Sequence, residues 1–394
     1  MRDAVIVAAT RTAVGKAKKG TTRHLRADEM MATVLRDLMH KTEGKLDPLL
    51  IDDVLVGCAM PEGEQGLNVA RAITLRAGLP VEVPSVTLNR FCSSGLQAIA
   101  QAAERIIANG ADVIVAGGVE SMSGVPMSGF KPSPNLWLSE HLPETYISMG
   151  HTAEQVADEY HINRADMDEW AFHSHRKATD ALARGRFDDQ IVHVHYEEVR
   201  WTDDGERIVE SKVFDRDEHV RPDTTLAQLA KLKPAFTEGG RVTAGNASPL
   251  SDGAAGVIVM EAALAARLGL TPLARFVGFA VAGVRPEIMG VGPAKAIPKL
   301  LQRVGLSLEQ IDLVEFNEAF ASQVLAVMRE LDLDPDKVNK DGGAIALGHP
   351  LGCTGAKLTV QLLSEFKVYG GKVGLVTMCI GGGMGAAGLF ENLQ

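Results

Sequence analysis

The chain has 394 residues, of which 46% are hydrophobic, only 5% are aromatic and 40 are glycines. This length provides a large buried core and favours two domains, or one domain with a sizeable insertion, and the many glycines suit an α/β protein with tight turns. A formal net charge of −10 argues against a protein that binds nucleic acid or an anionic membrane.

The start of the chain and its cysteines bear on the cellular compartment. The opening residues, MRDAVIVAATRTAVG, place an acid at position 3 before a short apolar run, unlike a signal peptide. No run approaches the ~20 apolar residues of a membrane span. The four cysteines are far apart and form no CxxC pair: Cys58, Cys92, Cys353 and Cys379. We therefore expect a reduced cytoplasmic protein with no disulfide framework, zinc cluster or membrane span.

Short and nearly continuous apolar runs predict buried strands in the first third of the chain. These runs are AVIVAAT at 4–10, VLVGCA at 54–59, SVTLN at 85–89 and DVIVAGG at 112–118. After Cys92 the pattern changes to helical spacing, and the apolar face carries Leu96, Ile99, Ala103 and Ile106. We expect this helix to end at Asn109-Gly110.

The region from Ser121 to about Ser248 is more polar than its flanks and holds all three tryptophans. Within it, MDEWAFHSHRKATDALARGRF at 167–187 predicts an amphipathic helix that ends at a glycine. We interpret the region as an insertion packed over the first half of the protein, where substrate contacts are expected.

The chain also contains a weak internal repeat with one constant offset. IDDVLVGCA at 51 aligns with IDLVEFNEA at 311, and 311 − 51 = 260. The same offset aligns SSGLQAIAQAAERI at 93 with CTGAKLTVQLLSEF at 353, and ADVIVAGGV at 111 with GKVGLVTMC at 371. The repeat predicts two halves of similar fold.

Cys92 is the first candidate for chemistry, because it follows a strand and precedes a helix. Ser93 or Ser94 could cap that helix, and Gly95 would allow close backbone approach. The positive end of a helix dipole lowers a thiol pKa and favours the nucleophilic thiolate. The alternative is that Cys92 is a small buried apolar residue, as most free cysteines are.

The second half offers three further candidates. His349 lies in the glycine-rich turn GGAIALGHPLGCTGA, near the repeat position of Cys92, and could be its base or a loop histidine bonded to backbone. Asn317, in VEFNEAF, could cap a helix or orient a water or a carbonyl. Cys379 ends a strand before three glycines, Gly381 to Gly383, whose N–H groups suit an oxyanion hole.

Two other motifs carry less weight. Residues 383–388 match GxGxxG, but the chain ends at 394 with no room for the helix and acidic residue of a dinucleotide site. His193 and His195 could share one strand face, but a third metal ligand is not evident, so we expect no metal site.

Taken together, these blocks resemble the thiolases, the acyl-CoA C-acyltransferases. The similarity spans essentially the whole chain and rests on NRFCSSGLQAI, NEAFA, GGAIALGHPLGCTGA and CIGGGMG, supported by SMGHTAEQVA and VTAGNASPLSDGAA. It implies an α/β thiolase fold of two similar βαβαβ-type halves, each with a five-stranded sheet, in five α-β-α-β-α layers. The implied units are 1–120 with 249–270 for the first half, 121–248 for a loop domain, and 271–394 for the second half.

The resemblance also assigns roles to individual residues. Cys92 is implied as the acyl-accepting nucleophile, His349 as the group that activates it and Cys379 as a second acid and base. Asn317 would hold a water that, with His349, stabilises a developing oxygen charge, and the N–H groups of Cys92 and Gly381 would form a second oxyanion hole. The implied substrate and CoA contacts are Ser248, Arg221, Met149, His151, Ala247 and Phe320. Pro249 departs from the smaller residue that is frequent at its position in the family.

The implied activity is the CoA-dependent cleavage of 3-oxoacyl-CoA to acetyl-CoA and a shortened acyl-CoA through an acyl-cysteine, as in fatty acid β-oxidation. CoA would be a co-substrate, no cofactor would stay bound, and the protein would be a homodimer or homotetramer, with association with other β-oxidation enzymes possible. The first alternative is a biosynthetic acetoacetyl-CoA thiolase. The second is a condensing enzyme of the same fold, which the motif NEAFA disfavours. The third is a non-catalytic acyl-CoA or lipid-binding relative, which should have lost Cys92, His349 or Cys379.

Overall fold

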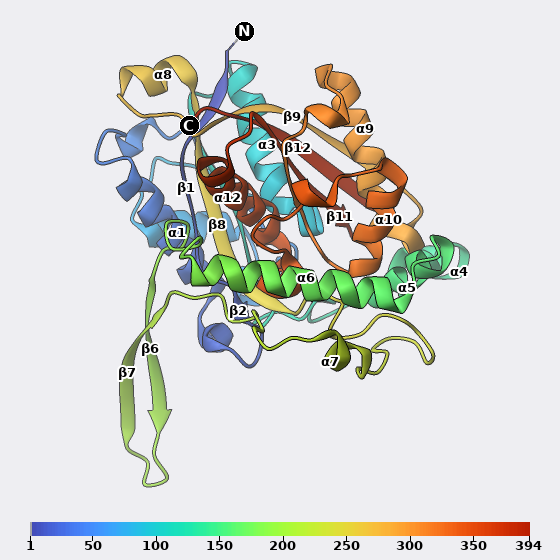
Figure 1. The fold of residues 1–394 in the computed structure, drawn as a ribbon. Helices are drawn as coiled ribbons and strands as arrows, with labels where there is room; N and C mark the ends of the chain where they lie inside the picture. The colour runs from blue at the N-terminus through green and yellow to red at the C-terminus, as the bar shows by residue number, and fades with distance from the viewer. Residues whose placement is uncertain (1) are drawn as a thin grey trace.

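The computed structural model describes residues 2–394, in which strands and helices alternate along most of the chain (Figure 1). The strands are β1 Ala4–Arg11, β2 Gly15–Lys16, β3 Asp53–Gly57, β4 Ser85–Leu88, β5 Val113–Ser121, β6 Val194–Trp201, β7 Arg207–Phe214, β8 Ser251–Glu261, β9 Ala274–Gly283, β10 Leu313–Phe316, β11 Val373–Ile380 and β12 Met384–Asn392. The helices are α1 Ala27–Lys41, α2 Val69–Ala77, α3 Ser94–Ile107, α4 Leu136–His141, α5 Met149–Glu159, α6 Arg164–Ala183, α7 Leu226–Ala230, α8 Ala262–Arg267, α9 Gly292–Val304, α10 Ala321–Leu331, α11 Ala344–Leu347 and α12 Leu351–Tyr369.

The main sheet has the strand order β10-β11-β12-β9-β1-β8-β5-β3-β4, with β2 paired to β8. Strands β3, β4 and β5 are parallel to one another, as are β10 and β11, and the pairs between these groups are antiparallel. The two halves of the chain meet where Val5 pairs with Arg275 and Ile6 with Ala274. The sheet therefore runs from one half into the other without a break.

The internal repeat is confirmed at the level of single hydrogen bonds. Asp52 accepts bonds from the backbone N–H groups of residues 112 and 113, before β5 and at its start. Asp312 accepts the corresponding bonds from residues 372 and 373, before β11 and at its start. Each residue of the second set lies 312 − 52 = 260 positions after its counterpart, so the offset read from the sequence is the offset of the folded halves.

The second half differs from the expected five strands in one place. Val314 of β10 forms a single parallel bridge with Val338, where β3 of the first half pairs with the full strand β4. Asn339 follows in the left-handed region (φ +48°), which turns the chain away before a second bridge can form. The edge position of the second half is therefore occupied by one bridged residue.

The two central helices, α3 and α12, cross at a symmetric pair of glycines. A β-carbon on Gly95 would lie 2.6 Å from the backbone nitrogen of Ala356, and one on Gly355 would lie 2.3 Å from that of Leu96. The two glycines are 355 − 95 = 260 positions apart. Glycine at both sites lets the helix backbones touch, which fixes the distance between the halves.

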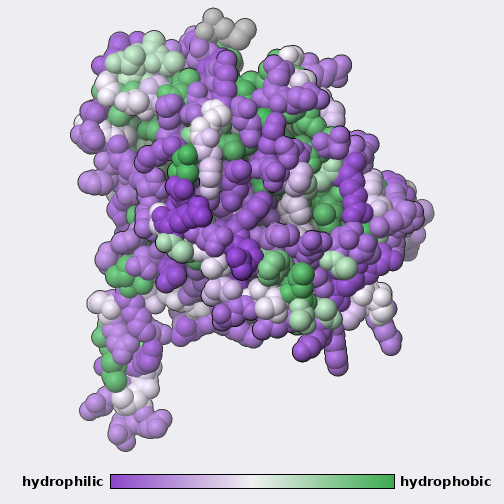
Figure 2. Space-filling model, in the orientation of Figure 1, coloured by the Kyte–Doolittle hydropathy of each residue, from purple (hydrophilic) through white to green (hydrophobic). Residues whose placement is uncertain are grey.

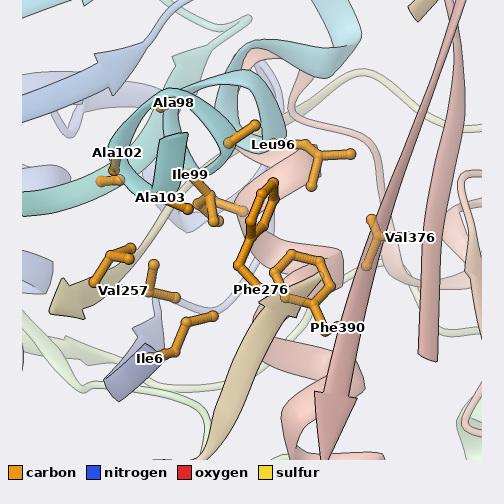
Figure 3. Packing of buried hydrophobic residues seen from close by; sticks show 14 of the residues in the cluster. Ile6, Leu96, Ala98, Ile99, Ala102, Ala103, Val257, Phe276, Val376 and Phe390 are labelled. Carbon is orange, nitrogen blue, oxygen red and sulfur yellow. The ribbon is translucent and has the colours of Figure 1, made fainter. Parts of the chain in front are cut away.

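Three buried apolar clusters lie between the layers of helices and strands. The central cluster surrounds α3 and α12, and Figure 3 shows Leu96 and Ile99 of α3 near Phe276 and Phe390 of the second half. A second cluster packs α1 and α2 against the outer face of the first half, and a third packs α9 and α10 against that of the second. The order helix, sheet, helix, sheet, helix that was expected is thus confirmed, with the strands of each half as one sheet layer and the pairing of β1 with β9 as the connection between the two.

The segment between β5 and β8 forms helices and a hairpin outside the main sheet. Its longest helix, α6, covers one end of the molecule, and Gly185 follows it in the left-handed region (φ +66°), as the sequence predicts. The two-stranded hairpin β6–β7 projects away from the body of the molecule (Figure 1), and the face of the molecule seen in Figure 2 is largely hydrophilic. Within residues 2–394, no helix has both the length and the apolar character needed to cross a membrane.

Candidate active site

Cys92 lies in a tight turn between β4 and α3 that is held by local hydrogen bonds. Phe91 occupies the left-handed region (φ +43°), a strained conformation for a residue with a side chain. Its N–H donates to the Asn89 side chain at 2.7 Å, and the Ser94 hydroxyl donates to its carbonyl at 2.7 Å. Neither Ser93 nor Ser94 caps α3 with its hydroxyl, so that prediction is wrong: Ser94 Oγ instead accepts from Arg90 N–H, before the turn.

The Cys92 thiol is 6% exposed, and its electrostatics differ from the sequence prediction. Burial raises the pKa of Cys92 to about 11 and outweighs hydrogen bonds from the N–H groups of Gly381 and of Cys92 itself, which act in the opposite direction. The prediction that the helix dipole lowers the pKa is therefore wrong for the free protein, because the loss of hydration destabilises the thiolate more than the nearby dipoles stabilise it. The sulfur stays a thiol until a base removes its proton.

His349 supplies such a base, because its hydrogen bonds fix one tautomer. Its Nδ1 lies 2.6 Å from the Thr354 hydroxyl, which donates its own proton to the carbonyl of Pro350 at 2.9 Å. The hydroxyl can then only accept from His349, so the ring proton sits on Nδ1 and Nε2 keeps its lone pair. Burial, followed by the charge of Lys357, lowers the pKa of His349 to about 3. The ring is held neutral and ready to accept a proton at Nε2.

Asn317 faces His349 from the end of β10. Its amide nitrogen lies 3.3 Å from Nε2 of His349, and its Oδ1 is buried with no partner among residues 2–394. The capping alternative is excluded, because α10 begins four residues later, after Phe320. An unpartnered buried amide oxygen is a costly group in a folded protein, and such a group is typical of a site that awaits a water or a ligand.

Cys379 lies at the end of β11, fully buried in an apolar cluster with Met149, Met289 and Phe320. Burial raises the pKa of the Cys379 thiol well above its ordinary value, and the nearby Cys92, when it is ionised, acts in the same direction. Gly382 and Gly383, which follow Gly381, both have positive φ values, and β12 begins at residue 384. The GxGxxG match therefore lies in a turn and a strand, which is not the setting of a dinucleotide motif.

A cavity of about 460 Å³ opens onto Cys92 and His349. Of the predicted contacts, it is lined by Met149, Arg221, Ala247, Ser248 and Phe320. The segment of Ala247 and Ser248 is fixed beside NEAFA, since Ala247 bridges to Phe320 and the Ser248 N–H donates to Ala319 at 2.9 Å. Asn317, Cys379 and Gly381 do not line the cavity, but Asn317 contacts His349 and the Gly381 N–H donates to the Cys92 sulfur.

His151 is the one predicted contact that does not line the cavity, although its ring lies edge-on to Phe236 of the wall, with ring centroids 6.5 Å apart. Its side chain is exposed on α5, where Nδ1 lies 2.6 Å from the Ser148 hydroxyl, and it is not part of the cavity wall. The helix turns it away from Met149, because positions two apart on a helix point in different directions. The rest of the cavity wall is formed by side chains that the sequence analysis did not identify, mainly Met122, Met127, Phe236 and Met289. They carry no motif, and only the folded chain brings them together.

In the described part of the chain, no group of three or more His, Cys, Asp or Glu side chains is arranged to hold a metal ion, so neither His193 nor His195 belongs to such a group. His195 is exposed on the projecting strand β6.

Comparison with known proteins agrees with this geometry. The family model for the thiolase N-terminal domain matches residues 4–263, and that for the thiolase C-terminal domain matches residues 270–392. The 3-ketoacyl-CoA thiolase of Bacillus subtilis is 54% identical over 391 residues, which cover 99% of this chain and 100% of that protein. The crystal structure of the Bacillus anthracis acetyl-CoA acetyltransferase superposes with a TM-score of 0.90 at 44% identity, covering 100% of this chain and 99% of the other. The dimeric peroxisomal thiolase of Saccharomyces cerevisiae gives a TM-score of 0.89 at 41% identity, with 99% and 97% covered.

Proposed function

The chain belongs to the thiolase family of acyltransferases, and we propose that it is a 3-ketoacyl-CoA thiolase that cleaves 3-oxoacyl-CoA with CoA as co-substrate. The observation that carries the proposal is one cavity lined by both a buried thiol, Cys92, and a neutral imidazole, His349, whose Nε2 keeps its lone pair. Fatty acid β-oxidation is the process in which such a cleavage is used.

The first half-reaction makes an acyl-enzyme. Nε2 of His349 takes the proton of the Cys92 thiol, and the thiolate attacks the 3-keto carbon of the substrate. The bond between C2 and C3 breaks, its electron pair forms the enolate of acetyl-CoA, and the Cys379 thiol protonates that enolate at C2. The acyl chain remains on Cys92 as a thioester.

The second half-reaction transfers the acyl group to CoA. The Cys379 thiolate removes the proton of the CoA thiol, and the CoA sulfur attacks the acyl-Cys92 carbonyl. The tetrahedral intermediate collapses, and the Cys92 sulfur leaves and regains its proton from His349. The N–H groups of Cys92 and Gly381 already point at the Cys92 sulfur, and they are suited to stabilise the oxyanion of this second half-reaction. Asn317 and His349 are suited to stabilise the oxyanion of the first half-reaction.

The loop domain, residues 121–248, would supply most of the acyl and pantetheine contacts. The cavity wall carries four methionines, Met122, Met127, Met149 and Met289, beside Phe236 and Phe320. Flexible thioether side chains adapt to ligands of different length, which favours a range of acyl chains over a single short one. Arg221 is the charged residue of this wall and would approach the CoA moiety.

The second candidate is a biosynthetic acetyl-CoA C-acetyltransferase, favoured by the 44% identity to the Bacillus anthracis acetyl-CoA acetyltransferase. Thiolysis rates on acetoacetyl-CoA, 3-oxohexanoyl-CoA, 3-oxodecanoyl-CoA and 3-oxopalmitoyl-CoA distinguish the two. The 3-ketoacyl-CoA thiolase should cleave the longer substrates at comparable or higher kcat/KM, and activity confined to acetoacetyl-CoA would replace it by the second candidate. Intact-protein mass spectrometry should detect the acyl-enzyme on wild type and none on Cys92→Ser. A non-catalytic acyl-CoA or lipid-binding relative would give neither activity nor adduct.

We further propose a cytoplasmic homodimer or dimer of dimers, which could associate with other β-oxidation enzymes. A dimer is supported by the dimeric yeast thiolase that superposes on this chain, and a reducing compartment by four cysteines that are all buried and free. Light scattering of the purified protein tests the oligomer, with a monomer as the contrary result.

A further inference from the structure

Glu318, the residue after Asn317, is a buried carboxylate with an unusual set of partners. It is 1% exposed and accepts four hydrogen bonds. The donors are Trp170 Nε1 at 3.0 Å, Ser174 Oγ at 2.7 Å, Asn339 Nδ2 at 2.9 Å and the backbone N–H of Ile345 at 3.1 Å. These bonds join Glu318 to segments that are far apart in the sequence.

The four donors come from three parts of the fold. Trp170 and Ser174 lie on α6, Asn339 follows the bridge to β10, and Ile345 lies on α11, four residues before His349. The carboxylate sits directly on Gly343, where a β-carbon would come within 2.1 Å of the carboxyl carbon. Burial raises the pKa of Glu318, and bonds from Ser174, Asn339 and Ile345 oppose this. Because all four partners donate, the acceptor-only ionised carboxylate fits the site.

Asn317 itself has few constraints of its own. Its backbone N–H donates to the carbonyl of Thr377 at 3.0 Å, its amide nitrogen faces His349, and its Oδ1 has no partner in the described chain. The direction of its side chain therefore depends on the backbone that carries it. That backbone is held on one side by the end of β10 and on the other by Glu318.

We propose that Glu318 is a positioning residue for the reaction: it links the peptide of Asn317 to the segment that carries His349, and thereby sets the Asn317–His349 pair in place. The inference rests on the proposed function, since the pair is taken as the oxyanion site of thiolysis. Glu318 has no contact with the cavity and acts through Asn317.

A double-mutant cycle separates positioning from simple stabilisation of the fold. Glu318→Gln preserves volume but turns an amide N–H₂ toward donors, which disturbs the link without leaving a void. We expect kcat for thiolysis to fall about tenfold with KM within about twofold of wild type, the result of an interaction needed in the transition state. In the Asn317→Ala background the same change should lower kcat by less than about twofold, because the residue through which Glu318 acts is gone.

Asp312→Asn is the matched control, because Asp312 also accepts backbone bonds through its carboxylate, at the opposite end of β10. It should lower the melting temperature and leave kcat unchanged. Trp170→Phe removes a single donor to Glu318 and serves if Glu318→Gln does not fold. Its smaller loss of kcat should likewise disappear in the Asn317→Ala background.

Equal losses of kcat in both backgrounds, a rise in KM alone, or unchanged kinetics in Glu318→Gln and Trp170→Phe would each overturn the inference while leaving the proposed function intact. Failure of the wild-type protein to cleave any 3-oxoacyl-CoA would overturn the proposed function, and the inference with it.

Discussion

The amide nitrogen of Asn317 lies 3.3 Å from Nε2 of His349, although 32 positions separate the two residues. Asn317 reaches this place from the end of β10 and His349 from the turn between α11 and α12. The unpartnered Oδ1 of Asn317 has a physical consequence. Removing the side chain leaves no donor of Oδ1 without a partner and breaks only the contact of the amide nitrogen with His349. Activity and stability should therefore respond differently.

Asn317→Ala should reduce kcat by about 10²- to 10³-fold, the size seen when one oxyanion donor is lost. KM should change little, because Asn317 does not line the cavity. The melting temperature should stay near that of wild type. Steady-state thiolysis and thermal denaturation of the same preparation check both parts. A large loss of stability would contradict this expectation and show that the Asn317 side chain helps to hold the fold.

Thr354→Val tests the tautomer of His349. Valine keeps the shape of threonine but removes the hydroxyl that accepts from Nδ1 at 2.6 Å. Without it the ring can rotate or place its proton on Nε2, where it can no longer accept from Cys92, so kcat should fall about 10- to 100-fold. Thr354→Ser retains the hydroxyl and should stay close to wild type. Equal losses in the two variants would point to packing as the cause.

Alkylation of Cys92 by iodoacetamide should report its raised pKa. Because burial raises the pKa of the free thiol to about 11, the thiolate fraction grows throughout the neutral and mildly alkaline range. The alkylation rate should therefore increase by about tenfold per pH unit from about pH 7 to pH 10. The modified residue is identified by peptide mass spectrometry. A plateau that begins near neutral pH would instead indicate a preformed thiolate.

His219 should make the native state sensitive to acid. It is buried, with Nε2 donating to the carbonyl of Gly15 at 3.1 Å, and burial lowers its pKa to about 4. In the unfolded state the histidine has a pKa near 6.5, so as the pH falls below 6.5 only the unfolded state takes up the proton. The free energy of unfolding that neutral His219 contributes above about pH 6.5 is therefore lost as the pH falls toward 4. Between about pH 7 and pH 5 this amounts to about 2 kcal/mol.

His219→Gln keeps a donor for Gly15 and cannot titrate, so wild type should lose about 2 kcal/mol more unfolding free energy than the variant over that interval. The comparison must be between the two proteins, because buried carboxylates with raised pKa values, such as Glu120 and Glu365, act in the opposite direction in both. Chemical denaturation at the two pH values measures the difference. Parallel losses would contradict the assignment.

Gly95→Ala should separate the two central helices. The added methyl would lie 2.6 Å from the backbone nitrogen of Ala356, and backbone cannot yield as a side chain can. We expect a loss of about 3 kcal/mol of unfolding free energy, as for overpacking of a tight core. Gly110→Ala, just beyond the end of the same helix, meets its nearest atom at 3.4 Å and should cost far less. A pair of similar melting temperatures would exclude the close crossing.

Several parts of the site could be predicted because they depend only on residues that are adjacent in the sequence. A cysteine before a helical pattern, a histidine between Gly348 and Pro350, and a cysteine before three glycines are patterns that no tertiary contact is needed to see. His151 shows the limit, since its place in a motif suggested a contact but the turn of α5 directs it into solvent. The pKa of Cys92 shows another, because burial depends on what packs over the thiol and not on its neighbours in the chain.

The sequence by itself determined the two halves, their 260-residue offset, the positions of four strands in the first third of the chain and the identities of the reactive groups. Periodicity and turn residues are local properties, and a repeat preserves them even at low identity. Only the tertiary structure decided which distant residues meet, namely Met122, Phe236 and Met289 on one cavity wall, Asn317 against His349, and Glu318 against α6 and α11. No single stretch of the chain specifies these contacts, because each joins elements that are far apart in the sequence. The crossing of α3 and α12 at Gly95 and Gly355 sets the distance between the halves, and the folded halves bring Cys92 and His349 to one cavity.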